Sequence, residues 1–151
     1  MDAWVVAIPA VLLMTVAVYT DLRHRLIYNW LTLPGIAYFL VVYAILTPGQ
    51  WFHHLLGVVL LGGITLMMAL VSKGQIGGGD IKLFAMVGAA MGWQAGFPAM
   101  VWTYLLAALF VVLLWFGHLI LKQKKQVKEL PMAPFIAGGM ALQVLFSAQD
   151  L

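Results

Sequence analysis

Apolar residues fill most of the chain in long runs, and short segments rich in polar residues, glycine or proline separate these runs. A helix needs roughly 20 apolar residues, with about 17 tolerated, to cross the hydrocarbon core of a bilayer. The pattern predicts six membrane-spanning helices. They cover residues 4–20, 30–47, 55–71, 81–93, 99–121 and 132–147. The break between the fourth and fifth helices is expected at residues 96–98, which include a glycine and a proline.

Composition supports lipid as the solvent of this chain. Of its 151 residues, 64% are hydrophobic and 9% are charged, and the mean hydropathy is +1.02. A soluble domain is closer to half apolar and a quarter charged. The chain has no cysteine, which excludes disulfides, a thiolate nucleophile and a cysteine metal site. We therefore predict an all-α, polytopic membrane protein.

The basic residues report the orientation of the chain in the membrane. All eight fall at the first, third and fifth predicted loops: Arg23, Arg25, Lys73, Lys82, Lys122, Lys124, Lys125 and Lys128. Lysine and arginine are retained in cytoplasmic loops during insertion, so we expect both termini on the extracytoplasmic side. This pattern explains the net charge of +3 without a nucleic-acid partner.

Two of the five acidic residues fall where a predicted cytoplasmic loop meets a predicted span. Asp2 and Asp150 are terminal, and Glu129 lies among lysines, whereas Asp21 and Asp80 share one membrane depth in the predicted topology. Two neighbouring carboxylates in a low dielectric cannot both ionise, so one keeps a proton. Such a pair can activate water and protonate a leaving amine.

Simpler interpretations of these residues remain open at this point. Asp80 could cap the helix that follows it, and Asp21 could be an interfacial charge balanced by Arg23 or Arg25. A small ion- or proton-coupled transporter component using the same acids is the alternative function. The predicted span at 81–93 is only about 20 Å long, so Asp80 can be drawn below the membrane surface.

The second acid lies in a block that resembles a known family. Residues 77–92, Gly-Gly-Gly-Asp-Ile-Lys-Leu-Phe-Ala-Met-Val-Gly-Ala-Ala-Met-Gly, look like the GxGD block of type IV prepilin peptidases, which are membrane aspartic endopeptidases. The segment around Asp21, with Arg25, Ile27 and Asn29, is similar to the family's first aspartate block. Residues 131–138 resemble the start of its last span, where Pro134 and Phe135 lie.

The resemblance implies one membrane-embedded peptidase domain over residues 1–151, with Asp21 and Asp80 as the catalytic pair. It places Gly77, Gly78 and Gly79 in a turn that admits the substrate backbone. Supporting roles are expected for Lys82, Arg25, Asn29, Pro134 and Phe135. Lys82 could tune the Asp80 carboxylate or extend its amine to the membrane surface.

The family also implies a substrate and a location. Its substrates are prepilin-like precursors, cut between a short basic leader and a hydrophobic helix at the cytoplasmic face of the inner (plasma) membrane. No cofactor is implied. The larger members carry a methyltransferase region with cysteine pairs, and the family often has proline where this chain has Tyr28. We expect peptidase activity without N-methylation, as in the short members serving tight-adherence (Flp-type) pili; archaeal preflagellin peptidases are similarly short.

The remaining polar and small residues have structural interpretations. His24, His53, His54 and His118 show no metal-ligand spacing, so we predict interfacial histidines and no metal site. Gly88 and Gly92 are four residues apart, a spacing that favours close helix packing over a catalytic role.

Overall fold

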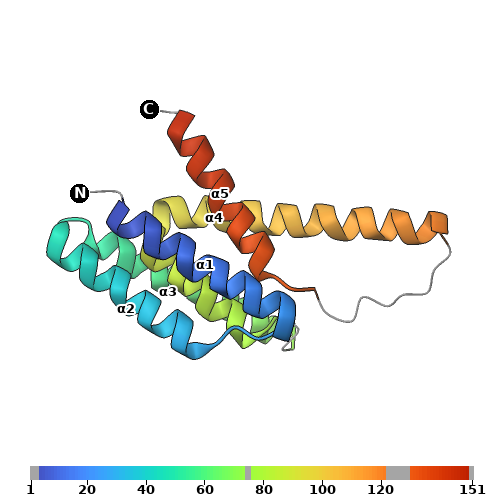
Figure 1. Cartoon of the computed structure of the whole chain (residues 1–151), viewed down its shortest axis with the longest axis horizontal. Coiled ribbons are helices and arrows are strands. Elements are labelled where there is room, and N and C mark those ends of the chain that lie inside the picture. Colours follow the sequence, from blue (N-terminus) through green and yellow to red (C-terminus); the bar gives the residue numbers. More distant parts are fainter. Residues whose placement is uncertain (1–3, 74–75, 122–129, 150–151) are drawn as a thin grey trace.

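The computed structural model describes residues 4–73, 76–121 and 130–149, and it is built from α-helices (Figure 1). The helices are α1 (Trp4–His24), α2 (Asn29–Leu46), α3 (Trp51–Val71), α4 (Gly78–Leu121) and α5 (Ala133–Gln149). The predicted basic loop with Lys122, Lys124, Lys125, Lys128 and Glu129 lies outside the described residues, as do Asp2 and Asp150.

The helices carry the surface expected of a protein in lipid. Four of them, α1, α2, α3 and residues 78–116 of α4, are long and apolar enough to cross a membrane, and α5 is a shorter apolar helix. Large apolar side chains cover their outer faces; Trp4 is 72% exposed and Val71 is 84% exposed. The chain is therefore a helical membrane protein, as its composition predicted.

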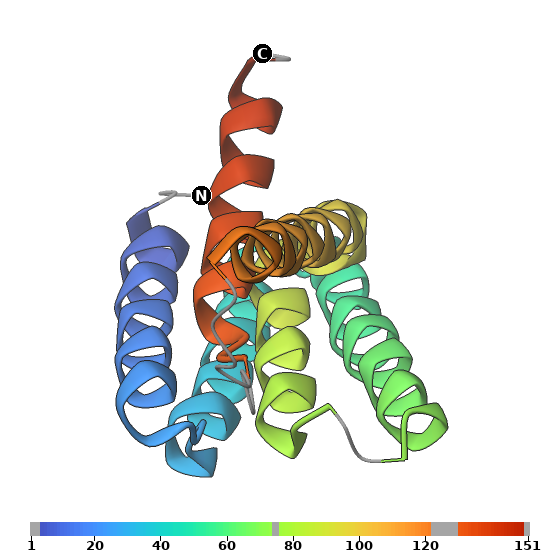
Figure 2. The same cartoon turned by 90° about the vertical axis from the view of Figure 1, so that its right-hand side faces the viewer.

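The number of separate helices differs from the prediction. Six were expected, and the described residues form five, because the fourth and fifth predicted spans belong to α4. α1, α2, α3 and the first part of α4 lie side by side, whereas the second part of α4 runs in another direction (Figures 1 and 2). The two predicted spans therefore occupy two differently oriented parts of one helix.

The change of direction in α4 occurs at Gly92. Its φ of 71° and ψ of 174° are not helical, and a positive φ is a conformation that glycine adopts at little cost. The predicted break at 96–98 is wrong, because Pro98 lies inside α4. Pro98 lies six residues after the kink, in the second turn of the second part of α4.

Two side chains from neighbouring helices bind the carbonyl groups just before the kink. A break in a helix leaves the preceding carbonyls without their usual partners. The Tyr43 hydroxyl donates to the Ala90 oxygen at 3.0 Å, and His54 Nδ1 lies 3.0 Å from the Ala89 oxygen. The Tyr43 and His54 rings stack with their centroids 3.3 Å apart. These contacts end the first part of α4 in much the same way as a helix cap.

One of the predicted interfacial histidines lies buried against other helices. His54 is only 6% exposed, because its ring is enclosed between Tyr43 and the kink. His24 and His53 are exposed, and His53 Nδ1 accepts a hydrogen bond from Trp93 Nε1 at 3.0 Å. The side chain of His118 lies outside the described residues.

Glycines allow α3 and α4 to pack backbone against backbone. A methyl group placed on Gly57 would overlap the Gly88 oxygen, and one on Gly88 would overlap the Gly57 oxygen. The predicted packing role is thus confirmed for Gly88, whereas Gly92 makes the kink. The apolar core lies beside this crossing and includes Phe39, Leu61, Leu83, Phe84 and Ile136, all fully or nearly fully buried.

Candidate active site

Asp21 lies in the last turn of α1 and is only 7% exposed. Its Oδ2 accepts a hydrogen bond from the backbone N–H of Ala133 at 2.9 Å. Ala133 is the first residue of α5 and is fully buried. A buried carboxylate requires such a partner. This bond joins the first helix of the chain to its last and fixes one carboxylate oxygen at a helix start.

Arg23 contacts Tyr19 and not Asp21, in contrast to one of the simpler interpretations of the sequence. Its guanidinium donates to the Tyr19 hydroxyl at 2.8 Å and lies 6.0 Å from the centre of that ring. Asp21 is therefore held by a backbone group instead of being an interfacial charge paired with Arg23.

Asp80 is the third residue of α4 and is half-buried. Asp80 is not the N-cap residue of the simpler interpretation, because α4 begins at Gly78 and Gly77 precedes it. The Asp80 carboxylate instead accepts a hydrogen bond from the Gly77 backbone, as the side chain at the third helical position does in a capping box. Asp80 thus stabilises the helix start from inside the first turn.

The structure brings the two predicted acids to one place. Asp21 acts electrostatically on Asp80, although α1 and α4 are far apart in the sequence. Two carboxylates that interact away from bulk water favour a state with one proton between them. The pair can therefore offer a base and an acid to one bound substrate.

The three glycines before Asp80 have different surroundings. A methyl group on Gly79 would lie 2.8 Å from Cβ of Ile27, one on Gly77 would lie 3.4 Å from Asp80 Oδ2, and one on Gly78 would meet nothing within 4 Å. In the described part of the chain, Gly92 is the only glycine with positive φ. Gly79 is therefore needed for close approach to the loop after α1, and Gly78 is open to an incoming chain.

Alanine substitutions should separate these glycines. Gly79→Ala pushes the start of α4 away from Ile27 and moves Asp80 relative to Asp21, so we expect at least a tenfold loss of activity. A misplacement of about 1 Å can cost on the order of 100-fold. Gly78→Ala, which adds the same methyl group in open space, is the matched control and should retain most activity. Equal activities for the two variants in a cleavage assay would contradict this assignment.

Two of the predicted supporting residues bind each other. Lys82 Nζ donates to Asn29 Oδ1 at 2.6 Å, joining the first turn of α4 to the first residue of α2. This exposed contact is compatible with an amine that extends to the membrane surface, and the tuning of Asp80 stays a prediction. The hydrogen bond positions the helix that carries Asp80.

A double-mutant cycle should detect the coupling between Lys82 and Asn29. An exposed contact to a charged side chain contributes about 1 kcal/mol or less. We expect Lys82→Met and Asn29→Ala each to lower activity a few-fold, and the double variant to be no worse than either single one. Multiplying losses in the double variant would mean that the two side chains act independently.

The other predicted supporting residues shape the ends of helices. Arg25 follows α1 and has a φ of 53°. Its backbone N–H donates to the backbone carbonyl oxygen of Asp21 at 2.9 Å, so Arg25 ends the helix in the left-handed conformation that is common just after a helix C-terminus. Pro134 lies in the first turn of α5, where its missing N–H costs little. The Phe135 ring packs against Phe110, with ring centroids 5.4 Å apart. All three fix the backbone near Asp21 and Ala133.

Sequence reasoning missed Tyr104, which lies in the second part of α4. Its side chain interacts electrostatically with Asp80 and shares a hydrogen bond with the Thr65 side chain. Its ring stacks on Phe84 with centroids 5.7 Å apart. Tyr104 belongs to no recognisable motif. It comes near Asp80 because the kink at Gly92 changes the direction of α4, which the sequence around Tyr104 does not show. The N–H of Ala133 was missed because backbone groups leave no sequence pattern.

The described side chains contain no group of three histidine, cysteine or acidic residues that could hold a metal ion. Asp21 and Asp80 are accompanied instead by backbone N–H groups, a tyrosine and a lysine–asparagine pair. This arrangement suits proton transfer to and from a polar substrate.

Comparisons with known proteins bear on the family of this chain. The model of the type IV leader peptidase family matches residues 8–112. A prepilin leader peptidase/N-methyltransferase of Bacillus subtilis is 29% identical over 141 residues, covering 93% of this chain and 55% of that protein. One from Aeromonas hydrophila is 32% identical, covering 82% of this chain and 44% of the relative. The chain thus spans about half the length of these curated relatives. No solved structure gives a significant match.

Proposed function

Because the chain belongs to the type IV leader peptidase family, we propose that it is an aspartic endopeptidase that removes the leader of prepilin-like precursors. Asp21 and Asp80 are the catalytic pair of this proposal. The proposal rests on one observation. Asp21 of α1 and Asp80 of α4 lie close enough to interact electrostatically, next to the uncovered backbone of Gly78. The names of the relatives support the substrate class.

The surroundings of the two acids suggest which of them holds the charge. Asp21 accepts the Ala133 N–H at the start of α5, and a helix start stabilises negative charge. In the proposed reaction, ionised Asp21 takes a proton from water, whose oxygen attacks the scissile carbonyl. Protonated Asp80 gives its proton to the carbonyl oxygen. As the C–N bond breaks, the leaving amine receives the proton that Asp21 took from water, and a hydroxyl proton of the intermediate returns to Asp80. Water is consumed and no cofactor is required.

The proposed topology has six crossings. It counts the two parts of α4 separately and includes α5, with both termini on the extracytoplasmic side. Arg23, Arg25, Lys73 and Lys82 lie near the ends of helices that carry or adjoin the acids, and positive residues favour the cytoplasmic side. We therefore assign the catalytic pair to the cytoplasmic face of the inner membrane.

We assign leader cleavage alone to this chain. The relatives' names include an N-methyltransferase, and the larger family members carry that activity in a region with cysteine pairs. This chain contains no cysteine. The proposal is therefore a peptidase without N-methylation.

Co-expression with a prepilin-like precursor tests the proposed function. The mass and the N-terminal sequence of the precursor should show loss of the leader, with an unmethylated new N-terminus. The alternative, an ion-coupled transporter component, predicts an intact precursor and ion flux in vesicles that depends on the two acids. A precursor that keeps its leader in the presence of the wild-type protein would refute the peptidase proposal.

Activity should withstand removal of divalent metals. Water activation by a carboxylate pair needs no metal ion, so we expect the cleavage rate of the purified protein to change less than twofold after treatment with EDTA. The comparison is made with the same preparation treated with buffer alone. Loss of cleavage that one added metal restores would contradict the proposed chemistry.

A further inference from the structure

Tyr104 connects α3 to both parts of α4. It belongs to the second part of α4, and its ring stacks on Phe84 of the first part with centroids 5.7 Å apart. Phe84 follows Asp80 by four residues, which places the two on one face of the helix. Thr65 of α3 is fully buried and shares a hydrogen bond with the Tyr104 side chain. Tyr104 is therefore fixed against α3 and against the helix face that carries Asp80.

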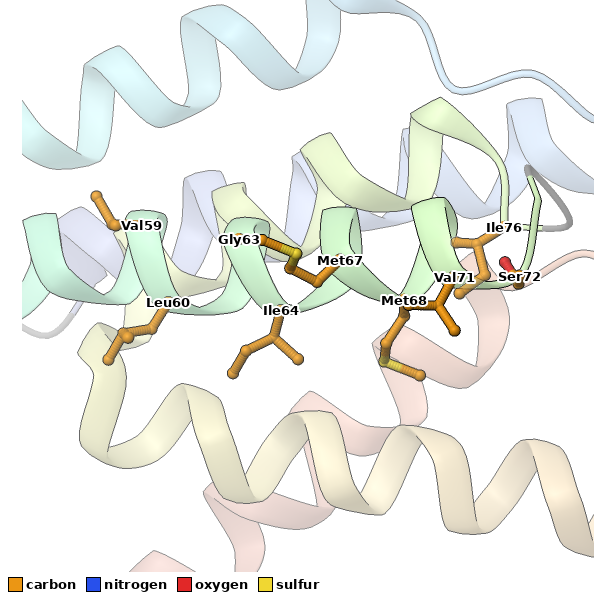
Figure 3. Close-up of a pocket in the computed structure, with 9 residues that line it drawn as sticks. All are labelled: Val59, Leu60, Gly63, Ile64, Met67, Met68, Val71, Ser72 and Ile76. Carbon is orange, nitrogen blue, oxygen red and sulfur yellow. The ribbon is translucent and has the colours of Figure 1, made fainter.

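The hydroxyl group of Thr65 uses its proton within its own helix. Other side chains of α3, such as Ile64 and Met68, line an apolar groove and offer no polar partner (Figure 3). The Thr65 hydroxyl donates to the backbone oxygen of Leu61, one turn earlier, at 2.7 Å. A peptide carbonyl can only accept, and a threonine hydroxyl has a single proton. Thr65 therefore has only acceptor lone pairs left for another partner.

The direction of the hydrogen bond between Thr65 and Tyr104 follows from this count. Because the Thr65 proton is already donated, the Tyr104 hydroxyl is the donor in the bond that joins them. The Tyr104 oxygen then also has only lone pairs left. Tyr104 and Asp80 interact electrostatically. A hydrogen bond between these two side chains must therefore have protonated Asp80 as its donor and Tyr104 as its acceptor.

We propose that Tyr104 is a positioning residue that keeps the shared proton of the acid pair on Asp80. The inference rests on the proposed function, in which Asp80 is the protonated acid. Asp21 accepts the N–H of Ala133, and a donor favours the charged form of a carboxyl group. Tyr104 offers Asp80 an acceptor, which favours the protonated form. The Gly77 N–H also bonds Asp80, but a protonated carboxyl group keeps a carbonyl oxygen that accepts it.

The chain of hydroxyl groups ends at a backbone carbonyl, which gives it one direction. In the proposed resting state, Asp80 donates to Tyr104. The chain then continues through Thr65 to the oxygen of Leu61. Because that carbonyl has no proton to return, both hydroxyl groups point away from the acid. The carbonyl oxygen of an arriving substrate can then replace the Tyr104 oxygen as acceptor and receive the proton of Asp80.

Removing the Tyr104 hydroxyl tests this role. Tyr104→Phe keeps the ring that stacks on Phe84, and the matched control Tyr38→Phe removes a hydroxyl that bonds the first turn of α1. In Tyr104→Phe, kcat for leader removal should fall about tenfold, the effect of one net hydrogen bond, with KM and the unfolding temperature near those of the wild type. Tyr38→Phe should match the wild type in all three. An unchanged kcat in Tyr104→Phe, or a rise in KM alone, would overturn the proposal.

Thr65→Val provides a second test, which also decides the question if Tyr104→Phe folds poorly. Valine keeps the shape of threonine without its hydroxyl, so the Tyr104 proton is free to turn to Asp80 and favour the carboxylate. We expect kcat to fall about tenfold, and adding Tyr104→Phe should cause no further loss. An unchanged kcat in Thr65→Val, or losses that multiply in the double variant, would refute the role of Tyr104 alone. Failure of the wild-type protein to cleave any precursor would instead refute the proposed function.

Discussion

Replacing either Asp21 or Asp80 by asparagine should reduce leader removal by roughly 10³-fold or more, the scale on which loss of an essential acid or base acts. Asparagine keeps the size of the side chain but cannot take or give the proton. In the Asp21→Asn variant, the amide oxygen can still accept the Ala133 N–H, so the helix contact survives. The measurement is the rate of leader loss from a co-expressed precursor in membranes.

Three controls make this result specific. Asp2→Asn is the same chemical change at an acid to which the proposal gives no role, and it should cleave at the wild-type rate. Both inactive variants should accumulate in the membrane to wild-type levels, which separates lost chemistry from lost folding. The double variant should be no worse than the worse single one, because the acids act as a unit. Normal cleavage by either single variant would exclude the pair.

Leucine at Gly57 or Gly88 should prevent stable folding. Each added side chain would enter the backbone of the opposite helix, where there is no flexible group to move aside. Overpacking of side chains costs about 1–3 kcal/mol, and a backbone collision exceeds that range. We expect the yield of folded protein in mild detergent to drop severely, as judged by a thermal unfolding assay and by size-exclusion chromatography.

Gly63→Ala is the matched control for this effect, because it changes a glycine of the same helix α3 in open space. Its unfolding temperature should stay near that of the wild type. A Gly88→Leu variant that unfolds at the wild-type temperature would mean that α3 and α4 can separate without loss of stability.

Much of this fold was predictable because lipid imposes strong constraints on sequence. Long apolar runs gave the helices to within a few residues at most of their ends, as at residue 71 of α3. The scarcity of acids singled out Asp21 and Asp80, since a carboxylate beside lipid requires a partner or a function. That the two acids lie at one membrane depth, which follows from the positions of the basic residues, stays a prediction.

The details that differed depend on contacts between distant segments. Gly92 and the Gly96–Pro98 segment are both typical of a break in a helix. The kink lies at Gly92 because Tyr43 and His54 bind the carbonyl groups just before it. His54 was expected at the membrane interface, and the sequence does not show that its ring contacts the carbonyl oxygen of Ala89. Tyr104 reaches the site only through the kink. Local patterns do not contain such long-range relations.

The bond between Asp21 and Ala133 also constrains biosynthesis. Its two residues are 112 positions apart, so nearly the whole chain must be synthesised before this hydrogen bond forms. Until α5 arrives, Asp21 lacks its buried partner and the backbone that positions it. If the proposed function holds, a nascent or truncated chain contains both acids but lacks the contact that positions Asp21, so leader cleavage begins only after the last helix has been inserted.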